Sequence, residues 1–243
     1  MRQRQSVFLG ELTRREFRQG MKDLCFKVAI LPLAATEQHL EHLAMEHDWR
    51  SVVAVAKQVA EKLQPQVLVA DALKVGISEH HMKHPGTLTL QPGTFLAVLS
   101  DLIDSLCRAG FEHVLVLNGH GGNVQPVQAV WDQFLRKFQI NLQFLSYWDV
   151  LTEADARELL RSGSRMPEDL PGHAQEFETA MALHLFPENV RNDVIETQGD
   201  RTPSLALPET GQVFYTRIVE RLCVVMRDMI NGKRIADVPS FHP

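Results

Sequence analysis

Cysteine is scarce in this sequence of 243 residues: Cys25, Cys107 and Cys223 lie far apart and share no C-x-x-C spacing. Three distant cysteines argue against a disulfide framework and against a cysteine zinc site. No signal peptide is expected either, because no long apolar stretch follows Met1 before charged residues return at Glu11. Unpaired thiols without a leader predict a cytoplasmic protein.

Long apolar runs and blocks of like charge are absent as well. The apolar run at residues 28–35 is interrupted by Pro32 and falls short of the ~18 residues of a membrane span. Lys and Arg total 25 against 30 Asp and Glu, which gives a formal net charge of −5. A chain without a basic face is not expected to bind nucleic acid or an anionic membrane.

The composition is otherwise that of an ordinary globular protein, with 44% hydrophobic residues, 14 Gly and 12 Pro. These proportions exclude collagen-like, low-complexity and disordered chains. We expect one domain over residues 1–243, although two small ones would also fit this length. The unusual count is 11 histidines, and histidine is the commonest metal ligand in proteins.

Apolar runs alternate with segments of helical period, which predicts an α/β domain of three layers around a mainly parallel sheet. Helices are expected where apolar residues recur at i, i+3, i+4 and i+7, and loops where Gly and Pro gather. The predicted strands are 28–31, 67–70, 114–117 and 142–145. The predicted helices are 49–63, 92–110, one spanning 127–138, 174–185 and one spanning 214–230, with loops at 160–172 and 195–211.

Chemistry is expected beyond the carboxyl ends of the strands, where open α/β sheets bind their ligands. The first strand leads into residues 36–48, where Glu37 and His39 alternate and so project to the same side of an extended loop. Asp48 can cap the next helix or bridge two metal ions. The alternative is a solvated acidic loop with an ordinary cap. Surface exposure is expected for Glu41, His42, Glu46 and His47.

The third strand leads into Asn118-Gly-His-Gly-Gly-Asn123. Its glycines allow a tight turn and close backbone approach. The amides of Gly121 and Gly122 can hold an anion or a developing oxyanion. His120, between glycines at the mouth of the sheet, is poorly placed for a packed core and is predicted to be a ligand or an acid/base.

Two further segments carry candidate side chains. Residues 78–87 contain Ser78 and three histidines before a Pro-Gly turn, which indicates a loop that faces the substrate or another subunit. At 172–179, His173 and Glu176 are i, i+3 neighbours and share a helix face, whereas Glu178 lies off that face. A capping role is the alternative for Glu176. The three histidines are His80, His81 and His84.

Taken together, these segments resemble the creatininase family of metal-dependent amidohydrolases. The resemblance covers most of the chain, and its strength lies in the order and spacing of the pieces rather than in any one of them. They are Ser6-Val-Phe-Leu-Gly-Glu-Leu-Thr13, Glu37-Gln-His39, Asp48, His84-Pro-Gly-Thr87, Asn118-Gly-His-Gly-Gly-Asn123, Leu145-Ser-Tyr-Trp-Asp149, and His173 with Glu178-Thr179.

The resemblance implies two divalent metal ions, typically zinc, manganese or iron, in a homo-oligomer that is often a hexamer. Glu37 and His120 resemble ligands of one ion, His39 resembles a ligand of the second, and Asp48 resembles the bridging carboxylate. His173 resembles the catalytic histidine that passes a proton from the attacking water to the leaving nitrogen.

The fifth ligand has to be inferred. Creatininase carries a metal-binding Glu two residues after the histidine of its Asn-Gly-His segment, and Gly122 occupies that position here. We expect Glu176 to replace it. Glu178 is the alternative ligand and is otherwise assigned to catalysis with His173.

Departures from creatininase concern the substrate. An aromatic residue is replaced by Gly121, and a Trp-Asp pair by Asp169 and Leu170, so the wall that would stack on the flat ring of creatinine is missing. Leu40 and Gln175 each replace a usual glycine and can reshape the pocket. We therefore expect a small cyclic or linear amide other than creatinine, bound near Ser78, His81, Gly121 and Gly122.

Two other functions fit parts of the sequence. The turn at 118–123 could cradle a nucleotide or phosphate, although it lacks a Walker lysine and the full dinucleotide fingerprint. A family member that has lost catalysis is the other alternative, against which His173 and the predicted ligands argue.

Overall fold

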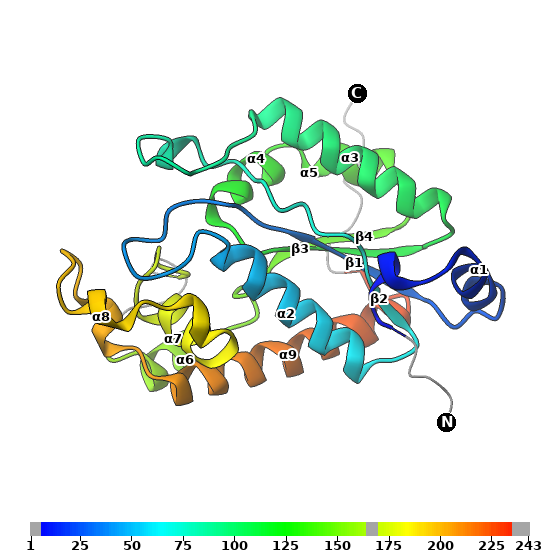
Figure 1. Cartoon of the computed structure of the whole chain (residues 1–243). Helices are drawn as coiled ribbons and strands as arrows, with labels where there is room; N and C mark the ends of the chain where they lie inside the picture. Colours follow the sequence, from blue (N-terminus) through cyan, green and yellow to red (C-terminus); the bar gives the residue numbers. More distant parts are fainter. Residues whose placement is uncertain (1–5, 164–169, 235–243) are drawn as a thin grey trace.

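Four parallel strands form the centre of the computed structural model, which describes residues 6–163 and 170–234. Within the sheet the strands follow the order β2-β1-β3-β4 (Figure 1). Asn118 pairs with Leu33 on one side and with Ser146 on the other, so β1, β3 and β4 end level with one another. The strands are β1 Val28–Leu33, β2 Val67–Val69, β3 His113–Asn118 and β4 Asn141–Ser146.

Helices cover both faces of this sheet, because alternate residues of each strand point to opposite sides. Val28 and Ile30 of β1 pack in a core with α2 (His47–Lys62), α7 (Glu176–Leu185) and α9 (Pro208–Ile230). Ala29 and Leu31 pack in a second core with α3 (Pro92–Arg108) and α5 (Trp131–Lys137). Figure 1 shows the two helical layers above and below the strands. The predicted three-layer α/β fold is therefore confirmed.

The remaining helices are short and lie outside these layers or at their ends. Two of them begin with capping boxes, Thr13 with Glu16 and Thr152 with Asp155, a signal that is legible in the sequence. They are α1 Arg14–Lys22, α4 Val124–Gln128, α6 Glu153–Leu159 and α8 Asn192–Ile195, with 3-10 turns at Leu9–Glu11, Glu79–His81, Gly121–Asn123, Pro187–Asn189 and Thr202–Leu205.

The strand predictions agree with the structure to within two residues, but one helix prediction does not. The helix expected across 127–138 is broken into α4 and α5, because Val130 leaves helical geometry with φ −121° and ψ 5°. The loop predicted at 195–211 also ends early, because α9 begins at Pro208, a residue favoured at the first position of a helix. Residues 164–169 of the predicted 160–172 loop lie outside the described residues. Within the described ranges, no helix combines the length and the apolar character needed to cross a membrane. The single domain over 1–243 stays a prediction.

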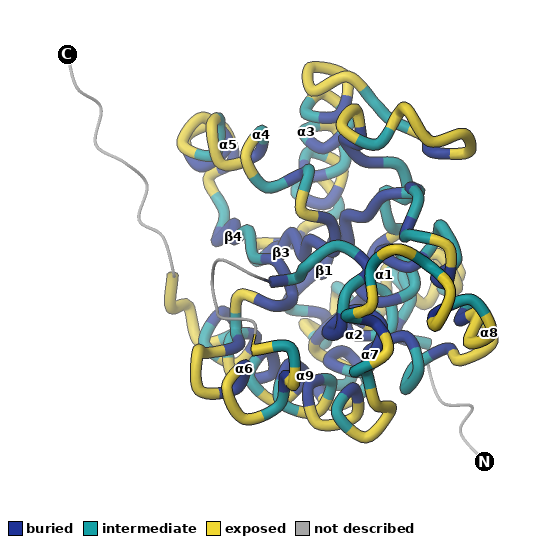
Figure 2. Tube along the Cα trace, turned by 90° about the vertical axis from the view of Figure 1, so that its left-hand side faces the viewer, coloured by how far each residue is buried: buried dark blue, intermediate teal, exposed yellow. Residues whose placement is uncertain are grey.

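Helices α7 and α9 touch at their backbones, which fixes where α7 ends up over the sheet. A Cβ at Gly211 of α9 would lie only 1.9 Å from the carbonyl oxygen of Ala180 in α7. Glycine alone permits this approach. Figure 2 shows buried residues along the strands and on the inward sides of the helices.

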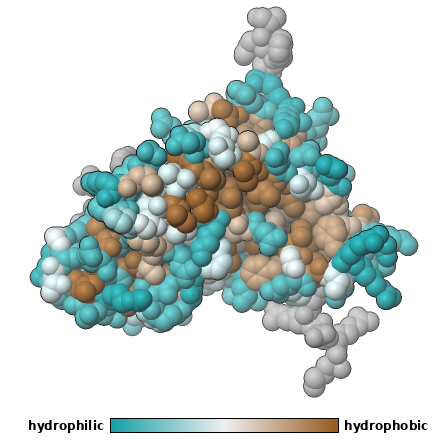
Figure 3. All heavy atoms as spheres, turned by 45° about the horizontal axis from the view of Figure 1, so that its top comes forward, coloured by the Kyte–Doolittle hydropathy of each residue, from teal (hydrophilic) through white to brown (hydrophobic). Residues whose placement is uncertain are grey.

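The outer side of the α3 layer carries an apolar surface. Figure 3 turns this side forward and shows apolar side chains gathered across it. A groove of about 310 Å³ between α3 and α5 is lined by apolar and polar side chains, among them Leu96, Ala97, Val130 and Phe134.

Candidate metal centre

Five acidic and imidazole side chains converge at the carboxyl edge of the sheet. Their residues are all buried, none more than 3% exposed. Charged groups buried this deeply must be paired with each other or bind a metal ion. Two follow β1, one follows β3, one comes from α2 and one from α7: Glu37, His39, His120, Asp48 and Glu178.

Asp48 lies at the centre of this cluster and presents one oxygen to each of two histidines. Its Oδ1 is 3.0 Å from Nε2 of His39, and its Oδ2 is 3.1 Å from Nδ1 of His120. Asp48 is the second residue of α2, and the N-cap is Glu46, so capping is not its task. A carboxylate that faces two imidazole nitrogens in this way has the geometry of a bridge between two cations.

Backbone carbonyls fix which nitrogen each of these histidines offers. Nδ1–H of His39 donates to the carbonyl of Glu37 at 3.0 Å, which leaves Nε2 for a ligand. Nε2–H of His120 donates to the carbonyl of Ile77 at 3.0 Å, which leaves Nδ1 for a ligand. Hydrogen bonds of this kind orient metal-binding histidines.

The cluster is short of positive charge. Two of its oxygens, Oε2 of Glu37 and Oδ2 of Asp48, are buried without a hydrogen bond from any described residue. Burial alone would lower the pKa of His39, but the carboxylates of Asp48, Glu178 and Glu37 together outweigh burial and raise that pKa to about 10. The donor set therefore favours a cation, and its carboxylates and imidazoles suit Zn²⁺ or Mn²⁺.

Among the described residues, donor atoms come within 4.8 Å of one another in three groups. The first is His39, His47, Asp48 and Glu178, which we name the inner group. The others share Glu37, which joins His39 with His173 in one and His80 with His120 in the other. Two ions bridged by Asp48 would draw their ligands from these side chains.

Glu176 does not face the cluster, contrary to expectation. Its two carboxylate oxygens accept hydrogen bonds from the backbone amides of Arg161 and Ser162 at 2.8 and 2.7 Å. Glu178 lies in the cluster instead, with Oε2 3.9 Å from Nε2 of His39 and 2.6 Å from the amide of Ala174. The structure thus brings together the alternative ligand rather than the expected one.

His173 lies at the mouth of the cluster, half-exposed, with Nδ1 3.5 Å from Oε1 of Glu37. Burial, together with His39 and His81, lowers its pKa to about 3, so the ring is neutral near pH 7. Gln38 also belongs to this site, although the sequence alone did not point to it. Its Nε2 donates to Nε2 of His173 and to Nδ1 of His81, both at 2.8 Å, and so fixes the orientation of both imidazole rings.

The other predicted pocket residues lie around His120. Ser78 is buried with Oγ 3.4 Å from Nε2 of His120. Gly121 is exposed beside it, whereas Gly122 is crowded: a Cβ there would lie 2.3 Å from the carbonyl of Ile77 and 2.9 Å from the His80 ring. A side chain at position 122 would therefore force the turn to shift.

Two histidines that were expected on the surface are buried. Nε2 of His42 bonds with Oγ1 of Thr179 at 2.8 Å, which joins the loop after β1 to α7. Burial, and next the nearby His39, lowers the pKa of His47 to about 3. His47, Ser51 and Val55 follow one another at intervals of four residues and so lie on the same face of α2. Extending the buried face of this helix back by one turn would have predicted that His47 is buried.

Two of the departures, Leu40 and Gln175, lie in the loop after β1 and at the start of α7. Leu40 has φ 53°, a left-handed conformation that favours the glycine usual at this position. Gln175 is extended at the N-cap of α7 and its Nε2 donates to Asp200 at 3.2 Å. Asp169 lies outside the described residues.

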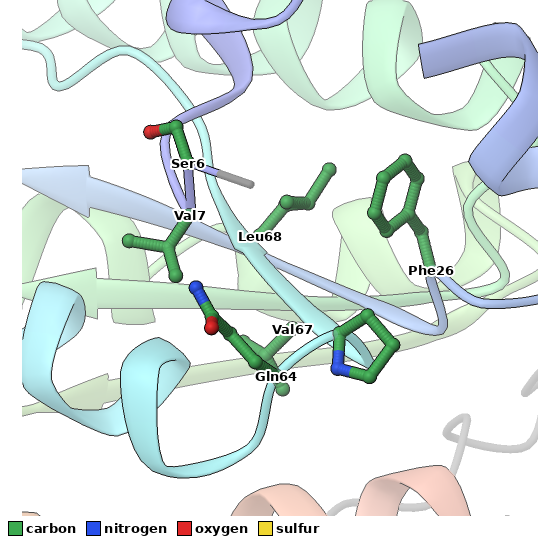
Figure 4. Close-up of a pocket in the computed structure, with 7 residues that line it drawn as sticks. Ser6, Val7, Phe26, Gln64, Val67 and Leu68 are labelled. Atoms are coloured by element: carbon green, nitrogen blue, oxygen red, sulfur yellow. The ribbon is translucent and has the colours of Figure 1, made fainter. Parts of the chain in front are cut away.

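A separate cavity of about 200 Å³ opens near the start of β2, at the other end of the strands from the cluster. Figure 4 shows Ser6, Val7, Phe26 and Leu68 around it. No acid, base or thiol of the described residues lines this cavity. This cavity therefore offers no side chain for acid/base or metal chemistry, unlike the carboxyl edge of the sheet.

A parallel α/β domain with buried carboxylates and imidazoles at this edge is typical of a metal-dependent hydrolase. The family profile described as creatininase, creatinine amidohydrolase, matches residues 10–222. The chain belongs to the creatininase family.

Curated relatives agree in class but differ in substrate. A creatinine amidohydrolase of Pseudomonas putida is 31% identical over 201 residues, covering 77% of this chain and 75% of that protein. A 3-dehydro-scyllo-inosose hydrolase of Thermotoga maritima is 28% identical, covering 84% and 63%. A mycofactocin precursor peptide peptidase of Mycobacterium tuberculosis is 30% identical, covering 72% and 64%. All three are hydrolases.

Solved structures of creatininase share the whole fold. One crystal structure of creatinine amidohydrolase matches with a TM-score of 0.81 and 27% identity, covering 93% of this chain and 98% of that one. A manganese form has a TM-score of 0.79 and 27% identity, and a variant of the Zn-Zn type has 0.79 and 26%, each covering 93% and 99%.

Proposed function

We propose that this chain uses two divalent metal ions, Zn²⁺, Mn²⁺ or Fe²⁺, to hydrolyse the C–N bond of a small cyclic or linear amide. The observation that carries the proposal is the position of Asp48 between His39 and His120, one carboxylate oxygen towards each. The zinc and manganese forms of creatininase support the choice of metals.

The residues divide between two metal positions that share Asp48. Glu37 and His120 would hold one ion together with Asp48, and His39 and Glu178 would hold the other, also with Asp48. Such ions lower the pKa of a coordinated water and polarise a scissile carbonyl. Glu178 accordingly replaces Glu176 in our assignment of ligands.

His173 would carry the proton. Its ring is held by Gln38 at one nitrogen, faces Glu37 with the other, and remains partly open to solvent. It therefore lies between the buried donors and an incoming substrate, where it can take a proton from the attacking water and deliver it to the leaving nitrogen.

The substrate would bind on the open side of the cluster, against Ser78, His81, Gly121 and Gly122. The rings of His81 and His173 lie 4.3 Å apart between centroids and form one wall. Gly121 offers no side chain, and no described heavy atom lies within 4 Å of the position its Cβ would take. Without an aromatic side chain at position 121, the site suits an amide other than the flat ring of creatinine. The relatives support this proposal, because they are named for different substrates.

An activity screen with His173→Ala as control tests the proposal. Metal-loaded protein would be assayed against lactams, cyclic ureas, formamides, short peptides and creatinine. We expect hydrolysis of at least one amide, with a loss of about 100-fold or more in His173→Ala and unchanged metal content. Activity that survives in this variant would remove His173 from the mechanism.

The two rival functions have less support. Helix α4, which follows the turn at 118–123, has only five residues, and the side chains of Asn118 and Asn123 bond to each other at 3.1 Å. This is a braced turn rather than a phosphate cradle. A family member without catalytic activity would not require a histidine beside the metal-binding residues. The ordered position of His173, fixed by Gln38, therefore argues against this alternative.

We also propose a homo-oligomer in the cytoplasm. The apolar surface over α3 and α5 supports self-association, and the three free cysteines support a reducing compartment. Native mass spectrometry tests the first point, and a monomer would refute it. Fractionation of cells that express the chain tests the second.

A further inference from the structure

One buried histidine beside the proposed ligands has no task so far. His47 is 1% exposed and precedes Asp48 at the start of α2. Its Nδ1 is buried without a hydrogen-bond partner among the described residues. A polar atom left unpaired in the interior is unfavourable, and an imidazole nitrogen is a common metal donor.

The position of His47 suits a single ion shared with its neighbours. The donor atoms of the inner group all lie within 4.8 Å of one another. Donors of a tetrahedral zinc centre with bonds of about 2.0–2.1 Å are about 3.4 Å apart. The distances of 3.0 Å from Nε2 of His39 to Asp48 and 3.9 Å to Glu178 lie on either side of that value.

The ring of His47 is also held in place from outside the cluster. Nε2 lies 3.4 Å from Oγ of Ser51, one helical turn further along α2. The ring of Phe186 packs edge-on against it, with centroids 5.7 Å apart at 65°. The ring of His39 lies 5.0 Å away on another side. A ligand held in this way needs little reorganisation to bind.

We propose that His47 is a fourth protein ligand of the ion bound by His39, Asp48 and Glu178, an inference that rests on the proposed function. The two metal positions are then unequal. The inner position has four protein donors, the closed set of a tightly held ion. The position at Glu37 and His120 has three, counting Asp48, and keeps a place for water and substrate.

Binding of Co²⁺ to the metal-stripped full-length protein tests this inference without an activity assay. Four-coordinate Co²⁺ absorbs visible light much more strongly than six-coordinate Co²⁺, so the spectrum reports the number of donors. His47→Cys offers a thiolate in place of the imidazole and should add a sulfur-to-cobalt charge-transfer band. His113→Ala is the matched control, because Nδ1 of His113 is also buried without a described partner but lies at the start of β3.

We expect the wild type and His113→Ala to bind two Co²⁺ ions, one with the intense spectrum. His47→Ala should bind the inner ion about 100-fold more weakly or worse and lose the intense bands, while the other ion stays. His47→Cys should show the new band, which also decides the question if His47→Ala does not fold.

Two results would overturn the inference, and they differ in what they say about the proposed function. If His47→Ala keeps both ions with wild-type affinity and spectrum and His47→Cys adds no band, His47 is not a ligand although the proposed function stands. If the wild type binds no divalent ion, the proposed function and this inference fail together.

Discussion

Glu176 and Glu178 lie two residues apart at the start of α7, and their carboxylates point in different directions and contact different parts of the protein. Two residues along an α-helix turn the side chain by about 200°. Glu176 accordingly reaches the amides of Arg161 and Ser162, whereas Glu178 reaches the buried cluster beside His39. One carboxylate fastens a loop and the other is available to a metal ion.

Exchanging each of these carboxylates for its amide should separate the two tasks. Glu178→Gln removes an anionic donor and is expected to lose one of two bound ions and most activity. Glu176→Gln weakens two charge-assisted hydrogen bonds and should cost about 1–2 kcal/mol of unfolding free energy with both ions retained. Metal analysis and urea denaturation measure the two effects. Loss of an ion from Glu176→Gln alone would reverse the assignment.

Position 122 is predicted to reject any side chain. In Gly122→Ala the new Cβ would lie 2.3 Å from the carbonyl of Ile77, so the turn must shift, at about 1–3 kcal/mol. The shift also moves His120, and kcat should fall. Gly121→Ala is the control, because no described heavy atom lies within 4 Å of its Cβ. Equal stability of both variants would contradict the crowding.

Asp155 should make stability depend on pH. Burial alone would raise its pKa, but hydrogen bonds from Arg221, Thr152 and Arg217 outweigh burial and hold the pKa well below the usual range. A carboxyl whose pKa is lowered by folding stabilises the fold above its unfolded pKa, about 3.9, and this contribution is lost as pH falls.

Asp155→Asn is therefore expected to lose about 2 kcal/mol near pH 7, less than for a fully buried pair because Arg221 is 38% exposed. The difference from the wild type should be full at pH 6–7 and shrink below about pH 4. Urea denaturation at several pH values measures it. A difference that grows in acid would show the opposite linkage.

Removing metal should lower both activity and stability. A chelator is expected to abolish hydrolysis and to lower Tm, since an ion present at 1,000 times its Kd stabilises the folded state by about 4 kcal/mol. Zn²⁺ or Mn²⁺ should restore both properties. Calorimetry of stripped and reloaded protein provides the measurement, and an unchanged Tm after complete stripping would argue against ions in the buried cluster.

Much of the fold was predictable because its signals are local. The runs at 28–31 and 114–117 are apolar and β-branched, and the strands β1 and β3 extend them by no more than two residues at either end. The break between α4 and α5 was not predictable, because the apolar spacing through Val127, Val130 and Phe134 continues across it. Only the backbone at Val130 shows where the helix ends.

The site divides in the same way. Glu37, His39, Asp48 and His120 were identified from sequence, because strand ends and family-like spacing both point to them. The choice between Glu176 and Glu178 depends on how α7 is rotated over the sheet, which its contact with α9 fixes. Spacing along the chain carries no information about that rotation.

The backbone contact between α7 and α9 has a consequence for the order in which the protein is built. Glu37, Asp48 and His120 all precede residue 121, so the ribosome delivers one set of donors early. Glu178 arrives late, and its place depends on α9 at Pro208–Ile230. The inner group is thus completed only when α9, the last of the described helices, has docked, and a cation bound there would join α7 to the loop after β1 and to α2.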